Sequence, residues 1–227
     1  MNAEITDFTL SVAGRGEVSA LCFRPAECRY FLVLGHGAGA GMRHTFMELL
    51  AEALAERGIG TLRYQFAYMD RGLRRPDPAH VLQTTVRAAV NSAGLIVRDL
   101  PLFAGGKSMG GRMTSLAQAD RPLHGLKGIA FYGFPLHPIG DPGSSRAEHL
   151  DQVALPMLFL QGTRDRLAQP VLLQPVLERL GQRATVEWLE EADHEFSLPK
   201  RGGMDKAAVA GWLADRTLAW MTGVTGR

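Results

Sequence analysis

Residues 102–112 read LFAGGKSMGGR. The apolar residues at the start of this stretch are typical of a buried strand, and the glycines that follow predict a tight turn. A helical pattern begins after the turn, so the stretch predicts a strand, a sharp turn and a helix. Ser108 lies at the turn, where its side chain would stand exposed at the carboxyl edge of a sheet.

Ser108 carries the strongest chemical signal of this stretch, because residues 106–110 form the pattern Gly-x-Ser-x-Gly. In that pattern the small flanking residues let a strand reverse so tightly that the serine hydroxyl is presented as a nucleophile. The alternative interpretation is an ordinary helix N-cap, which serine also favours. A phosphate-binding loop is disfavoured, because Pro101 stands where such a loop needs glycine.

The alternation of strand-like and helix-like segments predicts the fold class. A hairpin at 8–12 and 17–23 precedes apolar runs that alternate with amphipathic helical patterns. This order is typical of an α/β protein with about eight strands, a mostly parallel sheet and helices on both faces. The further strands are expected at 30–34, 59–66, 100–104, 126–132, 157–161 and 185–189, and the helices at 46–56, 80–93, 113–119, 171–180 and 207–221.

Two downstream residues supply the partners that a serine nucleophile needs. A serine hydroxyl is weakly nucleophilic until a base takes its proton and an acid orients that base. Asp165 follows the strand at 157–161, and His194 follows the last strand. Parallel strands bring both positions to the carboxyl edge that also carries Ser108. The chain order Ser, Asp, His therefore predicts a catalytic triad of Ser108, Asp165 and His194.

The glycine-rich stretch GHGAGAG at 35–41 is the predicted source of an oxyanion hole. Such a site uses one backbone amide after the nucleophile and one from an earlier strand-to-helix loop. Met109 provides the first amide, and Ala38 is the leading candidate for the second, with Gly37 close behind it. His36 is expected to hold this loop in place rather than to transfer a proton.

Three further residues are candidates for contacts around the site. Tyr68, which follows the strand at 59–66, and His137, in a proline-containing loop, are predicted substrate-binding residues. A satisfied structural role is the alternative for His137. Arg112 is expected to pair with a carboxylate or a helix end rather than with substrate.

The composition predicts one soluble domain over residues 1–227, since 46% of the 227 residues are hydrophobic and suffice for a sizeable core. The 25 basic and 23 acidic residues nearly balance, which argues against nucleic-acid binding. The sequence has no secretory leader and no run of about 18 apolar residues, so we expect a cytoplasmic protein without membrane association. The predicted partner is a small acyl substrate, with no metal and no organic cofactor.

Four motifs in this chain order resemble those of a known family. They are HGAG at 36–39, GKSMG at 106–110, GTRD at 162–165 and ADH at 192–194. Together they are most similar to those of lidless α/β-hydrolases, both small dienelactone-hydrolase-like proteins and the group related to the non-specific-lethal complex subunit three.

The resemblance implies an α/β-hydrolase fold without a large cap domain. It also implies carboxylesterase-like chemistry, in which Ser108, Asp165 and His194 cleave an ester or related acyl bond through an acyl-enzyme. The alternative is a non-catalytic binding or scaffold protein that keeps the same fold.

Overall fold

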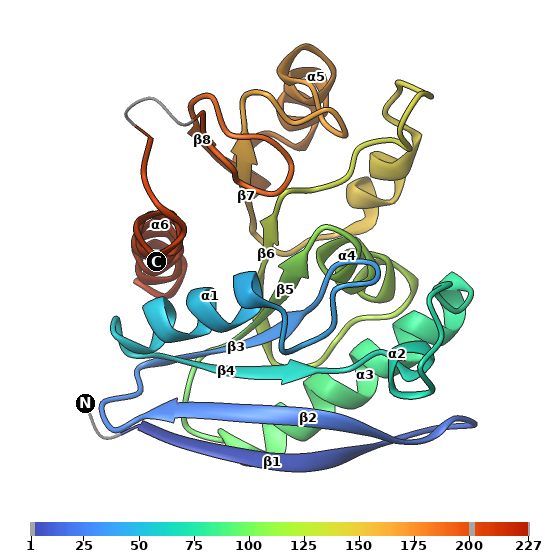
Figure 1. Ribbon diagram of the computed structural model, residues 1–227, viewed down its shortest axis with the longest axis vertical. Coiled ribbons are helices and arrows are strands. Elements are labelled where there is room, and N and C mark those ends of the chain that lie inside the picture. The colour runs from blue at the N-terminus through green and yellow to red at the C-terminus, as the bar shows by residue number, and fades with distance from the viewer. Residues whose placement is uncertain (1–2, 200–202, 227) are drawn as a thin grey trace.

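The computed structural model describes residues 3–199 and 203–226, and its central feature is one eight-stranded sheet (Figure 1). The strands are β1 (Ala3–Val12), β2 (Gly16–Pro25), β3 (Tyr30–Gly35), β4 (Ile59–Tyr64), β5 (Leu102–Lys107), β6 (Leu126–Tyr132), β7 (Met157–Gly162) and β8 (Ala184–Leu189). Their order in the sheet is β1-β2-β4-β3-β5-β6-β7-β8. β1 with β2 and β2 with β4 are antiparallel, whereas every later neighbouring pair is parallel. The predicted mostly parallel sheet is confirmed.

Helices cover both faces of this sheet. They are α1 (Thr45–Ala55), α2 (Ala67–Asp70), α3 (Ala79–Ile96), α4 (Met109–Asp120), α5 (Pro170–Leu180) and α6 (Lys206–Thr225), with the 3₁₀ segments η1 (Ser145–Gln152) and η2 (Gly181–Arg183). α1 and α6 contact each other on one face, and α3, α4 and α5 pack on the other. This two-sided cover is the arrangement that a mostly parallel sheet needs.

The apolar run of β3 shows how the two faces are built. Successive side chains of a strand point to opposite faces. Leu32 and Leu34 pack in the cluster that contains α1 and α6, whereas Phe31 and Val33 pack with α3 and α4. All four side chains are at most 1% exposed, which explains why the run is continuously apolar rather than alternating.

β4 ends two residues earlier than predicted, and the short helix α2 follows it. The amide of Phe66 donates to the side chain of His36 rather than to a neighbouring strand, so the chain leaves the ladder there. α2 contains 4 residues, too few to produce a helical period in a sequence. α2 is therefore absent from the predicted elements, as are the 3₁₀ segments η1 and η2.

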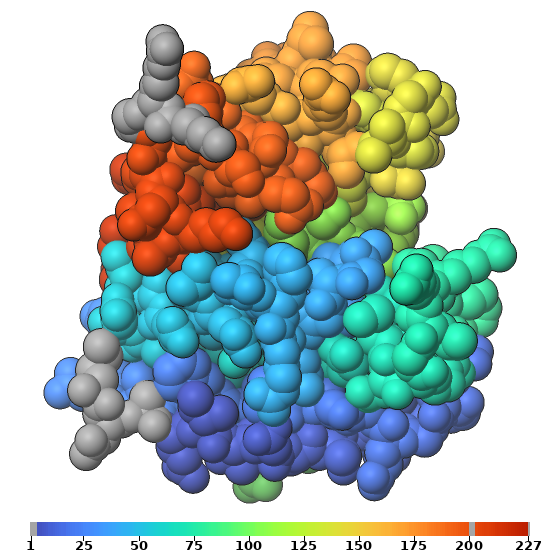
Figure 2. All heavy atoms as spheres, viewed as in Figure 1, coloured from blue at the N-terminus to red at the C-terminus, as the bar shows by residue number. Residues whose placement is uncertain are grey.

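The carboxyl edge of the parallel strands gathers the segments that carry the sequence motifs. The loop at 36–41 follows β3, Ser108 follows β5, Asp165 follows β7 and His194 follows β8. In Figure 2 the light-blue beginning of α1 lies against the orange-red segment after β8. The rings of Phe46 and Phe196 stack there, with centroids 5.8 Å apart. Residues 133–156, all of which the structure describes, form loops and η1 and no cap domain. No described helix combines the length and the apolar character needed to cross a membrane.

Candidate active site

Ser108 stands at the sharp turn between β5 and α4. Its φ of 48° lies in the left-handed region, which residues other than glycine rarely adopt. A residue held in such a conformation stores roughly 1–3 kcal/mol of strain. The strained turn presents the hydroxyl at the amino end of α4, as the sequence pattern predicts.

The glycines on either side of Ser108 are required by the close approach of β3. A Cβ atom added at Gly106 or at Gly110 would lie 2.3 Å from the carbonyl oxygen of Gly35. Neither position can accept a side chain unless the backbone of β3 moves. The glycines of the motif therefore permit backbone packing as well as the turn itself.

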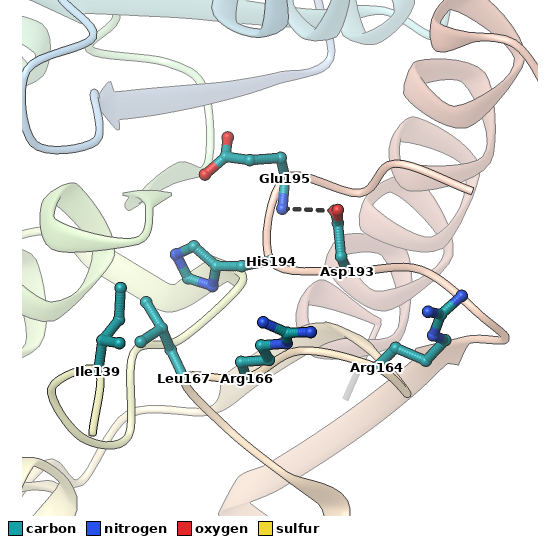
Figure 3. A pocket seen from close by; sticks show the side chains of 7 residues that line it. All are labelled: Ile139, Arg164, Arg166, Leu167, Asp193, His194 and Glu195. Carbon is teal, nitrogen blue, oxygen red and sulfur yellow. Dashed lines mark hydrogen bonds between the residues drawn. The ribbon is translucent and has the colours of Figure 1, made fainter. Parts of the chain in front are cut away.

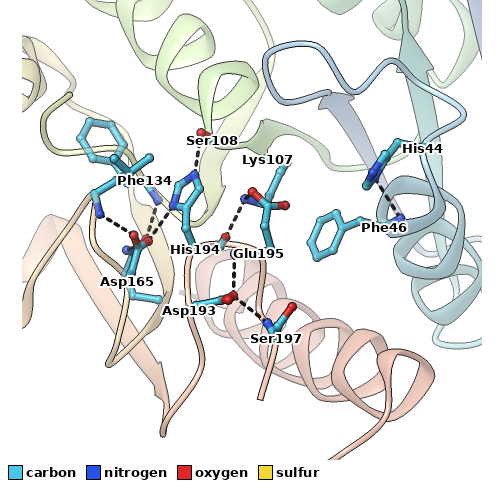
Figure 4. Close-up of polar contacts among 12 residues, drawn as sticks. His44, Phe46, Lys107, Ser108, Phe134, Asp165, Asp193, His194, Glu195 and Ser197 are labelled. Atoms are coloured by element: carbon cyan, nitrogen blue, oxygen red, sulfur yellow. Dashed lines mark hydrogen bonds and ion pairs between the residues drawn. The ribbon is translucent and has the colours of Figure 1, made fainter. Parts of the chain in front are cut away.

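A continuous chain of hydrogen bonds joins Ser108, His194 and Asp165 (Figure 4). Nε2 of His194 lies 2.9 Å from Oγ of Ser108, and Nδ1 lies 2.8 Å from Oδ2 of Asp165. Because a carboxylate can only accept, the ring proton is on Nδ1, and Nε2 is left to accept from the serine hydroxyl. The structure thus brings together the three residues that the sequence singles out, in the tautomer that a general base needs.

Asp165 is fully buried and receives hydrogen bonds on both of its oxygens. Oδ1 accepts from the Leu167 amide at 2.7 Å, and Oδ2 accepts from Nε2 of Gln161 at 3.2 Å as well as from His194. Gln161 in turn accepts from the Phe134 amide through Oε1, which sets the direction of its side-chain amide. Gln161 is not among the predicted site residues, because its single signal in the sequence is a polar residue at the end of an apolar strand.

The side chain of His36 anchors the glycine-rich loop. Nε2 accepts from the Phe66 amide at 3.1 Å, so the ring proton is on Nδ1, which donates to the Gly37 carbonyl at 2.7 Å. Burial lowers the pKa of His36 to about 4, which keeps the ring neutral at neutral pH. The expectation that His36 holds the loop is confirmed.

Tyr68 does not lie at the mouth of the site, and its predicted contact with substrate is wrong. Its side chain is 0% exposed, and its hydroxyl accepts from the Gly39 amide at 3.1 Å. The predicted strand at 59–66 ends earlier, and the turn into α2 directs the ring into the core. Tyr68 therefore supports the glycine-rich loop from within the protein.

His137 is also buried, and its contacts support the alternative of a structural role rather than the predicted substrate contact. The residue is 2% exposed, with Nδ1 2.7 Å from the Pro138 carbonyl and Nε2 2.6 Å from Oε1 of Gln169. These bonds tie the proline-containing loop to the residue that precedes α5. Both ring nitrogens are occupied within the protein, so the predicted substrate contact is wrong.

The predicted oxyanion-hole residues lie around the nucleophile. Ala38 and Met109 line a cavity of about 510 Å³ that also contains Ser108. Among the described residues, neither of their backbone amides donates to a protein acceptor. A Cβ atom added at Gly37 would lie 3.9 Å from Cβ of Ser108, so this loop runs close to the serine. Both residues therefore lie beside Ser108 with amides that have no acceptor among the described residues, as the oxyanion-hole prediction requires.

Lys107, the residue before the serine, connects the turn to the loop that carries His194. Nζ donates to the His194 carbonyl at 2.7 Å and lies 3.6 Å from Oε1 of Glu195 (Figure 4). The ammonium group also lies 5.8 Å from the ring centroids of Phe46 and Phe196. Burial lowers the pKa of Lys107. The contact depends on the meeting of loops after β5 and β8, and the sequence pattern does not indicate it.

A second hollow, a groove of about 570 Å³, borders His194 (Figure 3). Its lining includes apolar side chains and charges of both signs, namely Ile139, Leu167, Arg164, Arg166, Asp193 and Glu195. Oδ1 of Asp193 accepts from the amides of Glu195 and Ser197 at 2.9 and 2.8 Å. These two bonds shape the turn that presents His194 to the serine.

A family model described as "Alpha/beta hydrolase domain" matches residues 28–222. The chain belongs to the α/β-hydrolase family. The match covers most of the chain and includes all four motifs, from the glycine-rich loop to His194.

Solved α/β-hydrolases share the fold over nearly the whole chain. Dienelactone hydrolase from Anabaena variabilis is 20% identical over 98% of this chain and 99% of that chain, with a TM-score of 0.77. A serine hydrolase without a lid from Xanthomonas campestris is 21% identical over 97% and 96%, with a TM-score of 0.73. Est1E from Butyrivibrio proteoclasticus is 14% identical over 95% and 99%, with a TM-score of 0.72. The predicted lidless, dienelactone-hydrolase-like α/β-hydrolase fold is confirmed.

Proposed function

We propose that this α/β-hydrolase is a serine hydrolase that cleaves an ester or a related acyl bond through Ser108, His194 and Asp165. The observation that carries the proposal is the hydrogen-bonded chain from Oγ of Ser108 through His194 to Asp165, beside a cavity that opens at the serine. A helix N-cap, the alternative role for Ser108, receives no support, since its side chain makes no capping hydrogen bond to α4.

In the first half of the proposed reaction, Oγ of Ser108 attacks the carbonyl carbon while its proton moves to Nε2 of His194. The carbonyl oxygen becomes negatively charged and accepts hydrogen bonds from the amides of Ala38 and Met109. Asp165 stabilises the imidazolium that forms. When the bond to the leaving oxygen breaks, Nε2 gives its proton to that oxygen and the acyl group stays on Ser108.

In the second half, a water molecule attacks the carbonyl carbon of the acyl-enzyme and gives its proton to Nε2 of His194. The same two amides accept hydrogen bonds from the oxyanion. Collapse of this intermediate breaks the bond to Oγ and releases the carboxylic acid. The proton returns from His194 to Ser108, so the enzyme ends in its starting state.

A fluorophosphonate probe tests the proposal, because it forms a stable bond only with an activated serine. We expect labelling of Ser108, located by mass spectrometry of the digested protein. Heat-denatured protein and the Ser108→Ala variant are the matched controls and should remain unlabelled. A folded wild-type protein that is neither labelled nor able to hydrolyse any ester of a chain-length panel would instead be a non-catalytic binding or scaffold protein.

Lys107 is expected to position His194. Lys107→Met preserves much of the side-chain volume between the Phe46 and Phe196 rings but removes the donor to the His194 carbonyl. We expect kcat to fall roughly tenfold with little change in KM, because hydrogen bonds from a charged group are worth about 1.5–3 kcal/mol. Steady-state kinetics on an activated ester measure both constants.

Two further variants separate positioning from general stability. Lys107→Arg keeps a cationic donor and should restore part of kcat, whereas Glu195→Gln leaves the bond from Lys107 to His194 and should have the smaller effect. A Lys107→Met enzyme with wild-type kcat and only a lower melting temperature would show that Lys107 merely stabilises the fold.

A further inference from the structure

The cavity of about 510 Å³ beside Ser108 contains charged groups that the proposed reaction does not use. Most of its wall is apolar and includes Leu82, Met113 and Ile139. Three charged residues, Arg112, Arg146 and Asp77, also line the cavity. A partly buried charge in such a wall is costly unless a partner neutralises it, so each of the three needs an account.

Among the described residues, Asp77 has an ion-pair partner and the two arginines do not. Oδ1 of Asp77 lies 2.7 Å from the guanidinium of Arg71, which offsets its charge, although Oδ2 has no hydrogen-bond partner within the described residues. Within residues 3–199 and 203–226, no carboxylate pairs with Arg112 or with Arg146. Nε of Arg112 is buried and has no hydrogen-bond partner there. The expected pairing of Arg112 with a carboxylate or a helix end is therefore wrong.

The remaining neighbour does not compensate these charges either. His149 binds Oγ of Ser115 at 2.8 Å, and burial, with a further contribution from Arg112, lowers its pKa to about 4. The imidazole is thus neutral at neutral pH. Burial lowers the pKa of Arg112, and the like charge of Arg146 lowers it further. The cavity therefore holds two guanidinium groups that no described carboxylate pairs with, since Asp77, the one acidic residue in the lining, pairs with Arg71.

We propose that Arg112 and Arg146 form a subsite for an anionic substituent of the substrate, a carboxylate or a phosphate. A guanidinium matches either group with two parallel hydrogen bonds, and an anion here would neutralise two charges that the fold leaves unpaired. The inference rests on the proposed function in one respect, since it describes what the acyl substrate of Ser108 carries. It names a substrate class, namely esters with a negative charge a short distance from the reacting carbonyl.

The helix sets the backbone spacing between Ser108 and Arg112. Arg112 follows Ser108 by four residues, and its amide donates to the Ser108 carbonyl at 3.1 Å, so the two residues lie one helical turn apart on the same side of α4. One such step is about 6 Å along the helix axis. The apolar part of the cavity lining suits a short alkyl spacer. Half-esters of short dicarboxylic acids carry a carboxylate on such a spacer and are therefore the probes to use.

A matched pair of esters tests the subsite. The p-nitrophenyl half-ester of glutaric acid carries a carboxylate, and p-nitrophenyl pentanoate has the same chain length without it. We expect wild-type kcat/KM to favour the anionic ester. Arg112→Gln and Arg146→Gln should each lower the ratio of anionic to neutral kcat/KM roughly ten- to a hundredfold. Arg98→Gln, which removes an exposed arginine before β5, is the control and should leave the ratio unchanged.

Binding measurements keep this inference separate from the proposed function. Titration calorimetry with glutarate and with inorganic phosphate needs no turnover, and we expect at least one of them to bind, more weakly at high salt and in both variants. The better of the two anions identifies the group that the site prefers. Arg146→Gln is informative even where Arg112→Gln fails to fold, and circular dichroism checks both.

Three outcomes distinguish the two claims. An active, labelled enzyme whose ester preference and anion binding are unaffected by both substitutions would overturn the subsite and leave the hydrolase intact. Anion binding that both substitutions weaken, in a protein that fluorophosphonate does not label, would support the subsite and overturn the hydrolase. Binding of neither anion, together with no preference for the charged ester, would also overturn the subsite.

Discussion

Replacement of Ser108 by alanine is expected to lower kcat for an activated ester by at least roughly a thousandfold. The substitution removes the attacking oxygen, and Nε2 of His194 loses the hydroxyl that lies 2.9 Å away. Only the oxyanion hole and substrate binding would remain, which account for a small residual rate. Initial rates with the wild-type and variant enzymes, at matched concentrations of folded protein, measure the ratio.

A serine elsewhere provides the control for this variant. Ser92 lies in α3, and Ser92→Ala should leave kcat unchanged. Ser108→Ala should also remain folded, because alanine adds no atoms to the turn. A Ser108→Ala enzyme that retains near-wild-type activity would mean that another residue attacks the substrate.

Replacement of Asp165 by asparagine is expected to lower kcat by roughly a thousand- to ten-thousandfold. If the new side-chain amide faces His194, the ring must move its proton to Nε2 and can no longer accept from Ser108. If it faces the Leu167 amide instead, two N–H donors face each other where the Leu167 nitrogen now lies 2.7 Å from Oδ1 of Asp165. In both orientations the negative charge that stabilises the imidazolium is lost. The measurement is kcat for the same activated ester.

Asp193 offers a matched control for this second variant, because it lies beside His194 and differs from Asp165 in what it binds. Both of its hydrogen bonds, from the amides of Glu195 and Ser197, are accepted by Oδ1 alone. An asparagine oxygen can accept both, so Asp193→Asn should change kcat by less than roughly twofold. Equal losses in the Asp165 and Asp193 variants would argue against a special role for Asp165.

The elements around the site could be predicted because each depends on neighbouring residues. Apolar runs produce the buried strands of a parallel sheet, and their order brings Ser108, Asp165 and His194 to one edge. β6 (Leu126–Tyr132) has the predicted bounds, whereas β4 ends early, because the Phe66 amide is bound by the distant His36. The end of a strand that depends on a side chain remote in the sequence produces no periodic pattern in the residues around it.

The side chains that support the site could not be assigned in the same way. The side chain of Gln161 accepts a hydrogen bond from the Phe134 amide, and the hydroxyl of Tyr68 accepts one from the Gly39 amide. Both bonds join segments that are far apart in the sequence. Tyr68 and His137 have the chemistry of substrate-binding residues, but their burial depends on how their loops turn after leaving the sheet.

The sequence by itself determined the order of strands and helices, the strained serine turn and the identity of its two partners. These follow from local rules: apolar runs form buried strands, and glycines permit sharp turns and close backbone approach. The tertiary structure alone decided that Lys107 binds the loop of His194 and that Arg112 has no carboxylate partner among the described residues. The partners of these charges come from segments that meet only after folding. Hydrogen bonds and ion pairs are directional and short in range, so the residue types alone do not specify them.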